Sequence, residues 1–194
     1  VVGGIAPQHS HEEEWVKTFL RWMQRPELRG QFVFVPSCDT ALLRYQAIGA
    51  DICLNCPQPQ KEACGTSDQR SARNGGINVA VHSGGPPEYL EDGKSGMLIG
   101  PYINSQEFFE KAAKDILDKL RELADMYYAQ HLDDARWRDM KFQSYLASQK
   151  VTARAMEERY AAVYTQAIRT HQEKLRNEET ESVRIMPLHA PEET

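Results

Sequence analysis

This sequence has few cysteines, no long apolar run and no excess of positive charge. Each of these shortages excludes a class of protein. Four cysteines in 194 residues are too few for a disulfide scaffold, so we expect a reducing compartment, the cytoplasm. No apolar run approaches the roughly 18 residues of a membrane span, and no secretory signal is visible. With 23 basic and 28 acidic residues the formal charge is −5, which excludes a nucleic-acid binder held by bulk basic charge.

The chain also lacks an initiator methionine and opens directly on an apolar stretch at residues 1–5. We interpret this stretch as a strand, and a strand that begins at the first residue indicates a piece of a longer protein. A chain of 194 residues has the length for one domain with a sizeable core, or for one domain and a tail.

Short apolar runs alternate with helical patterns over the first 100 residues. The runs predict strands, and the patterns between them predict helices or helical turns: strands at residues 1–5, 32–35, 51–54, 77–81 and 97–99, and helices from residue 10 and at 39–48, 67–74 and 87–90. Residues 32–35 are wholly apolar, which is typical of a strand buried on both faces. Trp15, Phe19 and Trp22 recur at the spacing of a buried helix face, which we favour over a sugar-stacking platform. This alternation predicts an α/β fold with a Rossmann-like, doubly wound parallel sheet.

The sequence pattern changes after residue 104. Three amphipathic helices are expected there, at residues 105–130, 133–148 and 152 to about 175. One face of the first helix is apolar and carries Phe108, Phe109, Ala112, Ile116, Leu120 and Leu123. Helices this long must pack on the sheet or on another domain. The remainder is acidic and lacks an apolar period, so the predicted organisation is a sheet subdomain at 1–104, helices at 105–176 and a disordered tail at 177–194.

Two glycine-containing loops follow neighbouring predicted strands, at residues 62–67 and 82–88. In an open α/β sheet, ligands bind in loops at the carboxyl ends of the strands. Gly65, Gly84 and Gly85 allow a ligand to approach the backbone closely, and Glu62 adds a carboxylate. Either loop alone would more often be a simple turn. The two together predict a phosphate or sugar-phosphate site.

Residues 62–78 carry the most specific motif, E-A-C-G-T-S-D-Q-R-S-A-R-N-G-G-I-N. It resembles the cofactor segment of the α-glucan (glycogen, maltodextrin) phosphorylases, E-A-S-G-T-S-G-M-K-A-A-L-N-G-G-L-N. Residues 27–30, E-L-R-G, and 49–57, G-A-D-I-C-L-N-C-P, resemble the family's E-L-R-G and G-A-D-V-W-L-N-T-P. Residues 137–141 and 151–164 resemble its closing helices, so the resemblance covers most of residues 1–175.

Residues 84–99 resemble a second group, the retaining nucleotide-sugar glycosyltransferases. G-G-P-P-E at 84–88, followed by D-G-K-S-G-M-L-I at 92–99, is similar to their run G-G-x-P-E-x-x-x-D-G-x-x-G-x-L-V. Both groups share the GT-B architecture, in which two Rossmann-like domains enclose the active site. The resemblance implies that this chain is most of the C-terminal, donor-binding domain and that an N-terminal acceptor domain lies outside it.

Position 70 departs from both families. The phosphorylase lysine that binds pyridoxal phosphate as a Schiff base falls on Arg70, and a guanidinium cannot form that imine. We therefore expect no covalently bound pyridoxal phosphate. In the transferases the same position is the second glutamate of an E-x7-E motif, which Arg70 does not match either. Its cation could pair with a donor phosphate, or it could simply face solvent.

The resemblance implies the donor-binding half of a hexosyltransferase, active only within a longer chain. Its donor would be a nucleotide-sugar or a sugar phosphate and its acceptor a glucan or another hydroxyl compound, with no catalytic residue assigned. The substrate-binding candidates are Glu62, Gly65, Thr66, Ser67, Arg70, His82, Gly84 and Gly85. The alternative is a catalytically degenerate phosphorylase relative that serves as a glucan-binding, regulatory or assembly module.

We expect no metal site, because Cys53, Cys56 and Cys64 provide one C-x2-C pair and a third thiol where zinc needs four ligands.

Overall fold

The computed structural model describes residues 10–35, 39–132 and 134–184, so the strand expected at residues 1–5 lies outside the described residues. Its centre is a parallel three-stranded sheet in the order β1-β2-β3, formed by β1 (Ile52–Asn55), β2 (Ile77–Val81) and β3 (Met97–Ile99). Ile52 lies opposite Ile77, and Val79 lies opposite Met97. The predicted strands at 51–54, 77–81 and 97–99 are thus confirmed.

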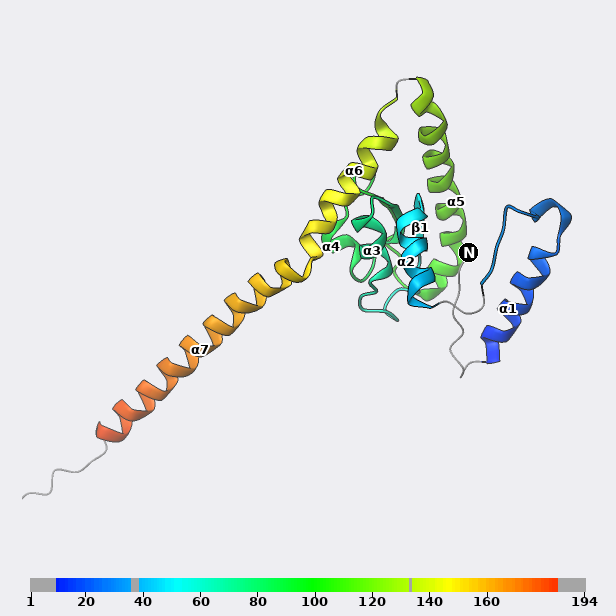
Figure 1. The fold of residues 1–194 in the computed structure, drawn as a ribbon. Coiled ribbons are helices and arrows are strands. Elements are labelled where there is room, and N and C mark those ends of the chain that lie inside the picture. Colours follow the sequence, from blue (N-terminus) through cyan, green and yellow to red (C-terminus); the bar gives the residue numbers. More distant parts are fainter. Residues whose placement is uncertain (1–9, 36–38, 133, 185–194) are drawn as a thin grey trace, which may run out of the picture.

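Both faces of this sheet are covered, as the doubly wound prediction requires (Figure 1). Every residue of β2 is buried, and alternate side chains enter two different cores because successive residues of a strand point to opposite faces. Ile77, Val79 and Val81 pack with α5 (Ser105–Ala129) and the start of α6 (Arg136–Ser148). Ala80 packs on the other face with α3 (Ser67–Arg73) and α4 (Pro86–Tyr89).

Helix α6 connects the two faces. Trp137 and Met140 lie in the core beneath α5, whereas Ala147 near the helix end lies in the core beneath α3. Between them the buried Ser144 hydroxyl donates to the Gly76 carbonyl at 2.8 Å, just before β2. This course brings η3 (Gln149–Val151) and the start of α7 (Ala153–Arg184) to the side of α3.

The helix caps follow from the sequence. Asp39 precedes α2 (Thr40–Gly49) and its Oδ1 accepts from the Leu42 amide at 2.8 Å. Asn104 caps α5 in the same way through the Glu107 amide at 2.9 Å. Gly75, at φ +75°, follows α3 in the left-handed conformation that glycine adopts without strain. These helices were predicted within one or two residues.

The N-terminal segment departs from its prediction. Helix α1 (Ser10–Met23) and η1 (Pro26–Leu28) stand beside the sheet domain in Figure 1. The side chain of Trp15 is 61% exposed, so the aromatic face is not a buried helix face. Its Phe19 ring packs instead on Phe32 and Phe34 of the segment that follows.

The strand expected at residues 32–35 is also absent. Of residues 32–35 only Val35 forms a bridge, and the side chain of Val33 is 52% exposed. Burial on both faces needs helices above and below a strand as well as paired neighbours, and among the described residues the aromatic contacts of this run are with α1.

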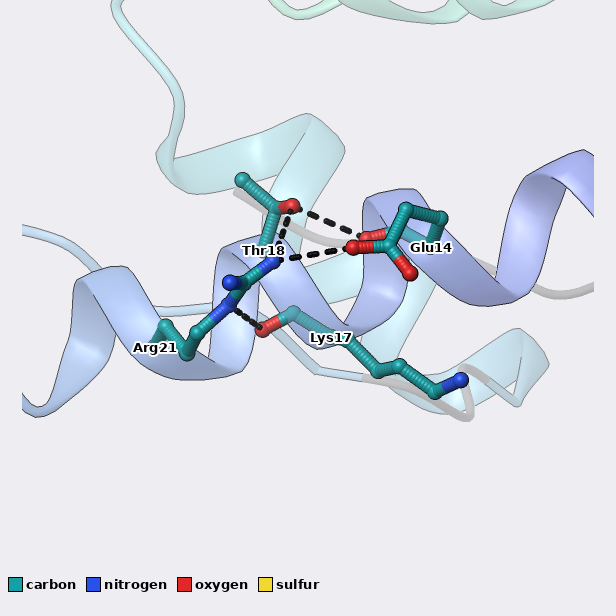
Figure 2. A network of polar contacts seen from close by, with 4 residues as sticks. All are labelled: Glu14, Lys17, Thr18 and Arg21. Carbon is teal, nitrogen blue, oxygen red and sulfur yellow. Dashed lines mark hydrogen bonds and ion pairs between the residues drawn. The ribbon is translucent and has the colours of Figure 1, made fainter.

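Exposed polar contacts link successive turns of α1. Arg21 spans two turns, donating to Glu14 Oε1 at 3.0 Å and to the Thr18 hydroxyl at 3.1 Å, while its Nε donates to the Lys17 carbonyl (Figure 2). Exposed ion pairs of this kind contribute little stability. The aromatic contacts therefore carry most of the structure of this segment.

The C-terminal helices correct three expectations. Phe109 is 69% exposed, because Phe108 fills the core at the first turn of α5 by packing on Tyr102. Helix α7 projects from the domain as a single long helix with an exposed surface, so of the two expected packing partners, the sheet and another domain, it does not take the sheet (Figure 1). It continues to Arg184, so the tail predicted from residue 177 begins as helix, and residues 185–194 lie outside the described ones. None of the described helices is long and apolar enough to cross a membrane.

Candidate functional site

The two predicted glycine loops are in direct contact. Gly84 has φ +65°, and a Cβ built on it would lie 2.8 Å from the Ala63 carbonyl oxygen and 3.2 Å from that of Glu62. A Cβ on Gly85 would lie 2.6 Å from the Cys64 sulfur. A side chain at Gly84 therefore has no room, and the loop after β2 closes against the loop after β1. We call residues 62–67 and 82–85 the loop pair.

Glu62 and Ser67 lie on the first loop of this pair. The Glu62 carboxylate folds over Gly65, since Oε1 would be 2.7 Å from a Cβ there. The Glu62 side chain is exposed and makes no hydrogen bond or ion pair with any residue of the described ranges, so its oxygens can accept from a ligand hydroxyl. Ser67 begins α3, and its hydroxyl lies 3.5 Å from Asn55 Oδ1 at the end of β1. Thr66 precedes the helix with its side chain exposed.

A buried polar group supports the loop pair from below. Asp68 is fully buried, and the Tyr89 hydroxyl donates to its Oδ2 at 2.9 Å. The Asn78 amide group donates to the Asp68 carbonyl at 3.0 Å. These bonds tie together α3, α4 and β2, the three elements that carry or adjoin the two loops. Burial and the neighbouring Asp68 raise the pKa of the Tyr89 hydroxyl, which keeps it a donor.

The sequence reasoning missed this group. Its one signal was Asp68, which stands where the phosphorylase pattern has glycine. Asp68 Oδ1 and Asn78 Oδ1 are both buried without a hydrogen-bond partner among the described residues. Buried acceptors without a partner are costly, so this group is a weak point in the packing beneath the loop pair.

Arg70 and His82 lie outside the contact between the loops. Arg70 is exposed on α3, beside a hollow of about 590 Å³ between α2, β1 and α3. Its guanidinium makes no hydrogen bond or ion pair to a described residue. The His82 amide donates to the Ile99 carbonyl at 2.8 Å and its side chain is exposed. The structure thus brings Glu62, Gly65, Gly84 and Gly85 together where the loops meet. It places Thr66 and Ser67 at the start of α3, and Arg70 and His82 at the margin of this contact.

Burial affects the two cysteines in and just after β1. Cys53 and Cys56 are half-buried, and burial raises the pKa of the Cys56 thiol to about 11. Burial likewise raises the pKa of Cys53. Within residues 10–35, 39–132 and 134–184, no three His, Cys, Asp or Glu side chains are grouped to hold a metal ion.

Sequence comparisons relate part of this chain to phosphorylases. No protein-family model matches it. The glycogen phosphorylase of Mycobacterium tuberculosis (strain CDC 1551 / Oshkosh) is 34% identical over 99 residues, which is 51% of this chain and 11% of the relative. That of Aquifex aeolicus is 29% identical over 127 residues, 65% of this chain and 18% of the relative. The maltodextrin phosphorylase of Thermococcus litoralis is 31% identical over 101 residues, 52% of this chain and 12% of the relative. The chain thus spans less than a fifth of the length of these curated relatives.

Solved structures identify the fold. Sucrose-phosphate synthase from Thermosynechococcus elongatus superposes with a TM-score of 0.60 at 19% identity, covering 87% of this chain and 38% of that one. Anabaena HepE, solved in complex with UDP-glucose, superposes with a TM-score of 0.56 at 20% identity, covering 85% of this chain and 40% of that one. About half of this chain is therefore similar in sequence to a part of the α-glucan phosphorylases, and its fold is the Rossmann-like GT-B fold of the solved neighbours.

Proposed function

We propose that this chain is the donor-binding half of a GT-B hexosyltransferase, working in the cytoplasm within a longer protein. It transfers a glycosyl unit from a nucleotide-sugar or a sugar phosphate to a glucan or another hydroxyl acceptor, and an N-terminal domain supplies the acceptor. One observation carries this proposal: the loops after β1 and β2 close on each other through Gly84, at the edge of the sheet where open α/β folds bind ligands.

In this proposal each part of the loop pair has a role. The exposed Glu62 carboxylate accepts hydrogen bonds from sugar hydroxyls. The amides of Gly65, Thr66 and Ser67 bind the donor phosphate. Gly84 and Gly85 let the donor approach the backbone. That HepE was solved with UDP-glucose supports a nucleotide-sugar as the donor class.

The two residues at the margin complete the site. Arg70, which is without an ion-pair partner in the described ranges, neutralises charge on the donor phosphates, and His82 donates to a phosphate or sugar hydroxyl. Their placement fits a mechanism of positioning and charge stabilisation, the largest contributions in many enzymes.

Pyridoxal phosphate does not fit this site as a covalent group. The phosphorylase lysine corresponds to Arg70, whose guanidinium is always protonated and forms no imine. We therefore propose transfer without covalent pyridoxal phosphate, and no step depends on that group.

The test measures donor binding to the full-length protein by titration calorimetry, with UDP-glucose and glucose 1-phosphate as probes. Glu62→Gln removes a charged acceptor and should weaken binding about 10- to 100-fold. The matched control is Glu122→Gln, an exposed carboxylate on α5 away from the loops, which should leave the affinity unchanged.

Two results would contradict the proposal. Donor binding that is equal in both variants would remove Glu62 from the site. If neither donor binds and the protein binds only glucan, the chain is instead a degenerate phosphorylase-like module.

A further inference from the structure

A second hollow, of about 400 Å³, lies between α3 and the start of α7. One wall comes from α3 and the turn after it, where helical spacing places five residues on one side: Thr66, Gln69, Arg70, Arg73 and Asn74. The opposite wall is the connection from α6 to α7, formed by Ser148, Val151, Thr152 and Ala153. We call this space the α3–α7 hollow.

The charge of its lining is one-sided. Two arginines and no acidic side chain line it, in a chain with 28 acidic residues and a formal charge of −5. Neither Arg70 nor Arg73 makes an ion pair or side-chain hydrogen bond within the described ranges, whereas Arg21, Arg136 and Arg154 each pair with a carboxylate. Two unpaired guanidinium groups three residues apart on one helix repel each other, and an anion between them would relieve that repulsion.

The structure orients one of the two arginines. The Arg73 guanidinium lies 5.4 Å from the centroid of the Tyr145 ring, a cation–π contact that leaves its N–H groups available. The first turn of α7 adds the positive end of a 32-residue helix at Thr152 and Ala153. The phosphorylase pattern has Met and Leu at the positions of Gln69 and Arg73, so this lining is more polar than that pattern.

We infer that the α3–α7 hollow binds a phosphate monoester, with Arg70 and Arg73 gripping its oxygens. Guanidinium groups bind phosphate through paired N–H donors, and the hollow has room for a small sugar attached to that phosphate. This site goes beyond the proposed donor site. It shares Thr66 and Arg70 with the donor site but contains neither Glu62 nor the second loop.

The experiment titrates the full-length protein with glucose 6-phosphate, inorganic phosphate and glucose, followed by calorimetry. We expect saturable binding of glucose 6-phosphate and none of glucose. Arg73→Gln should weaken glucose 6-phosphate binding at least tenfold. Arg73→Lys keeps the positive charge but loses the paired N–H donors of the guanidinium, so it should weaken this binding less. The matched control is Arg169→Gln, which removes one exposed charge from α7 beyond the hollow and should change the affinity less than twofold.

Three outcomes would overturn the inference: no saturable binding of the ester, equal affinity in Arg73→Gln and Arg169→Gln, or binding of inorganic phosphate as tight as that of the ester. Circular dichroism of each variant confirms that it is folded. The donor site is tested separately, because Glu62→Gln should weaken donor binding and leave glucose 6-phosphate binding intact.

Discussion

Replacing Gly84 with alanine tests the contact between the two loops. Two penalties arise at this position. The left-handed backbone, at φ +65°, costs an alanine about 1–2 kcal/mol. The new Cβ would also lie 2.8 Å from the Ala63 carbonyl oxygen, so the backbone of one loop must move. Overpacking against backbone adds about 1–3 kcal/mol.

Gly93→Ala separates these penalties. Gly93 has φ +72°, and a Cβ there would meet nothing within 4 Å. The control therefore carries the backbone strain alone. We expect Gly84→Ala to lower the free energy of unfolding by about 1–3 kcal/mol more than Gly93→Ala does. This difference is the cost of overpacking the new Cβ against the Ala63 carbonyl.

Urea denaturation followed by tryptophan fluorescence measures both variants, and calorimetry measures their donor affinity. Gly84→Ala should also lose donor binding, because the loops can no longer close, while Gly93→Ala should keep it. Equal losses of stability in the two variants, or unchanged donor binding in a folded Gly84→Ala protein, would refute the reasoning.

Two further predictions concern the buried layer and the cofactor. Tyr89→Phe leaves the buried Asp68 carboxylate without its donor and should cost about 1–3 kcal/mol at neutral pH. The pKa of the Tyr89 hydroxyl is higher in the folded protein than in the unfolded chain. The stability that this hydroxyl contributes is therefore complete below about pH 10 and is lost as the pH rises further. The urea midpoints of the wild-type and Tyr89→Phe proteins should accordingly converge above about pH 10. The purified full-length protein should show no pyridoxal absorbance and no pyridoxyl adduct by mass analysis after borohydride reduction, and an adduct on any lysine would contradict this.

The parts of the fold that the sequence predicts well are those whose pattern admits one arrangement. Residues 77–81 are apolar at four of five positions and are flanked by turns, so a strand buried on both faces is the simplest outcome. Gly75 and the caps Asp39 and Asn104 fix helix ends through local bonds. The glycine loops were predictable because both follow neighbouring strands of a parallel sheet.

The failures occur where the outcome depends on distant partners. The apolar run at residues 32–35 has the composition of a strand, yet its aromatic rings pack on Phe19 of α1. Composition alone does not show whether such a run pairs with a strand or packs on a helix. Helix α7 continues past residue 177 because glutamate and arginine are good helix formers and no Gly or Pro interrupts it. The sequence pattern did not predict this continuation because residues after 177 lack an apolar period. Nothing in the local pattern predicts the burial of Asp68, whose carboxyl group accepts from the Tyr89 hydroxyl of α4.

Hydrogen–deuterium exchange with and without UDP-glucose tests the central claim, that the loop pair is the donor site. The full-length protein should show slowed exchange in residues 62–67 and 82–85 together on adding the nucleotide-sugar, and Glu62→Gln should reduce that protection at the same concentration. UDP-glucose that binds without protecting either loop, or that protects only segments elsewhere, would contradict the account.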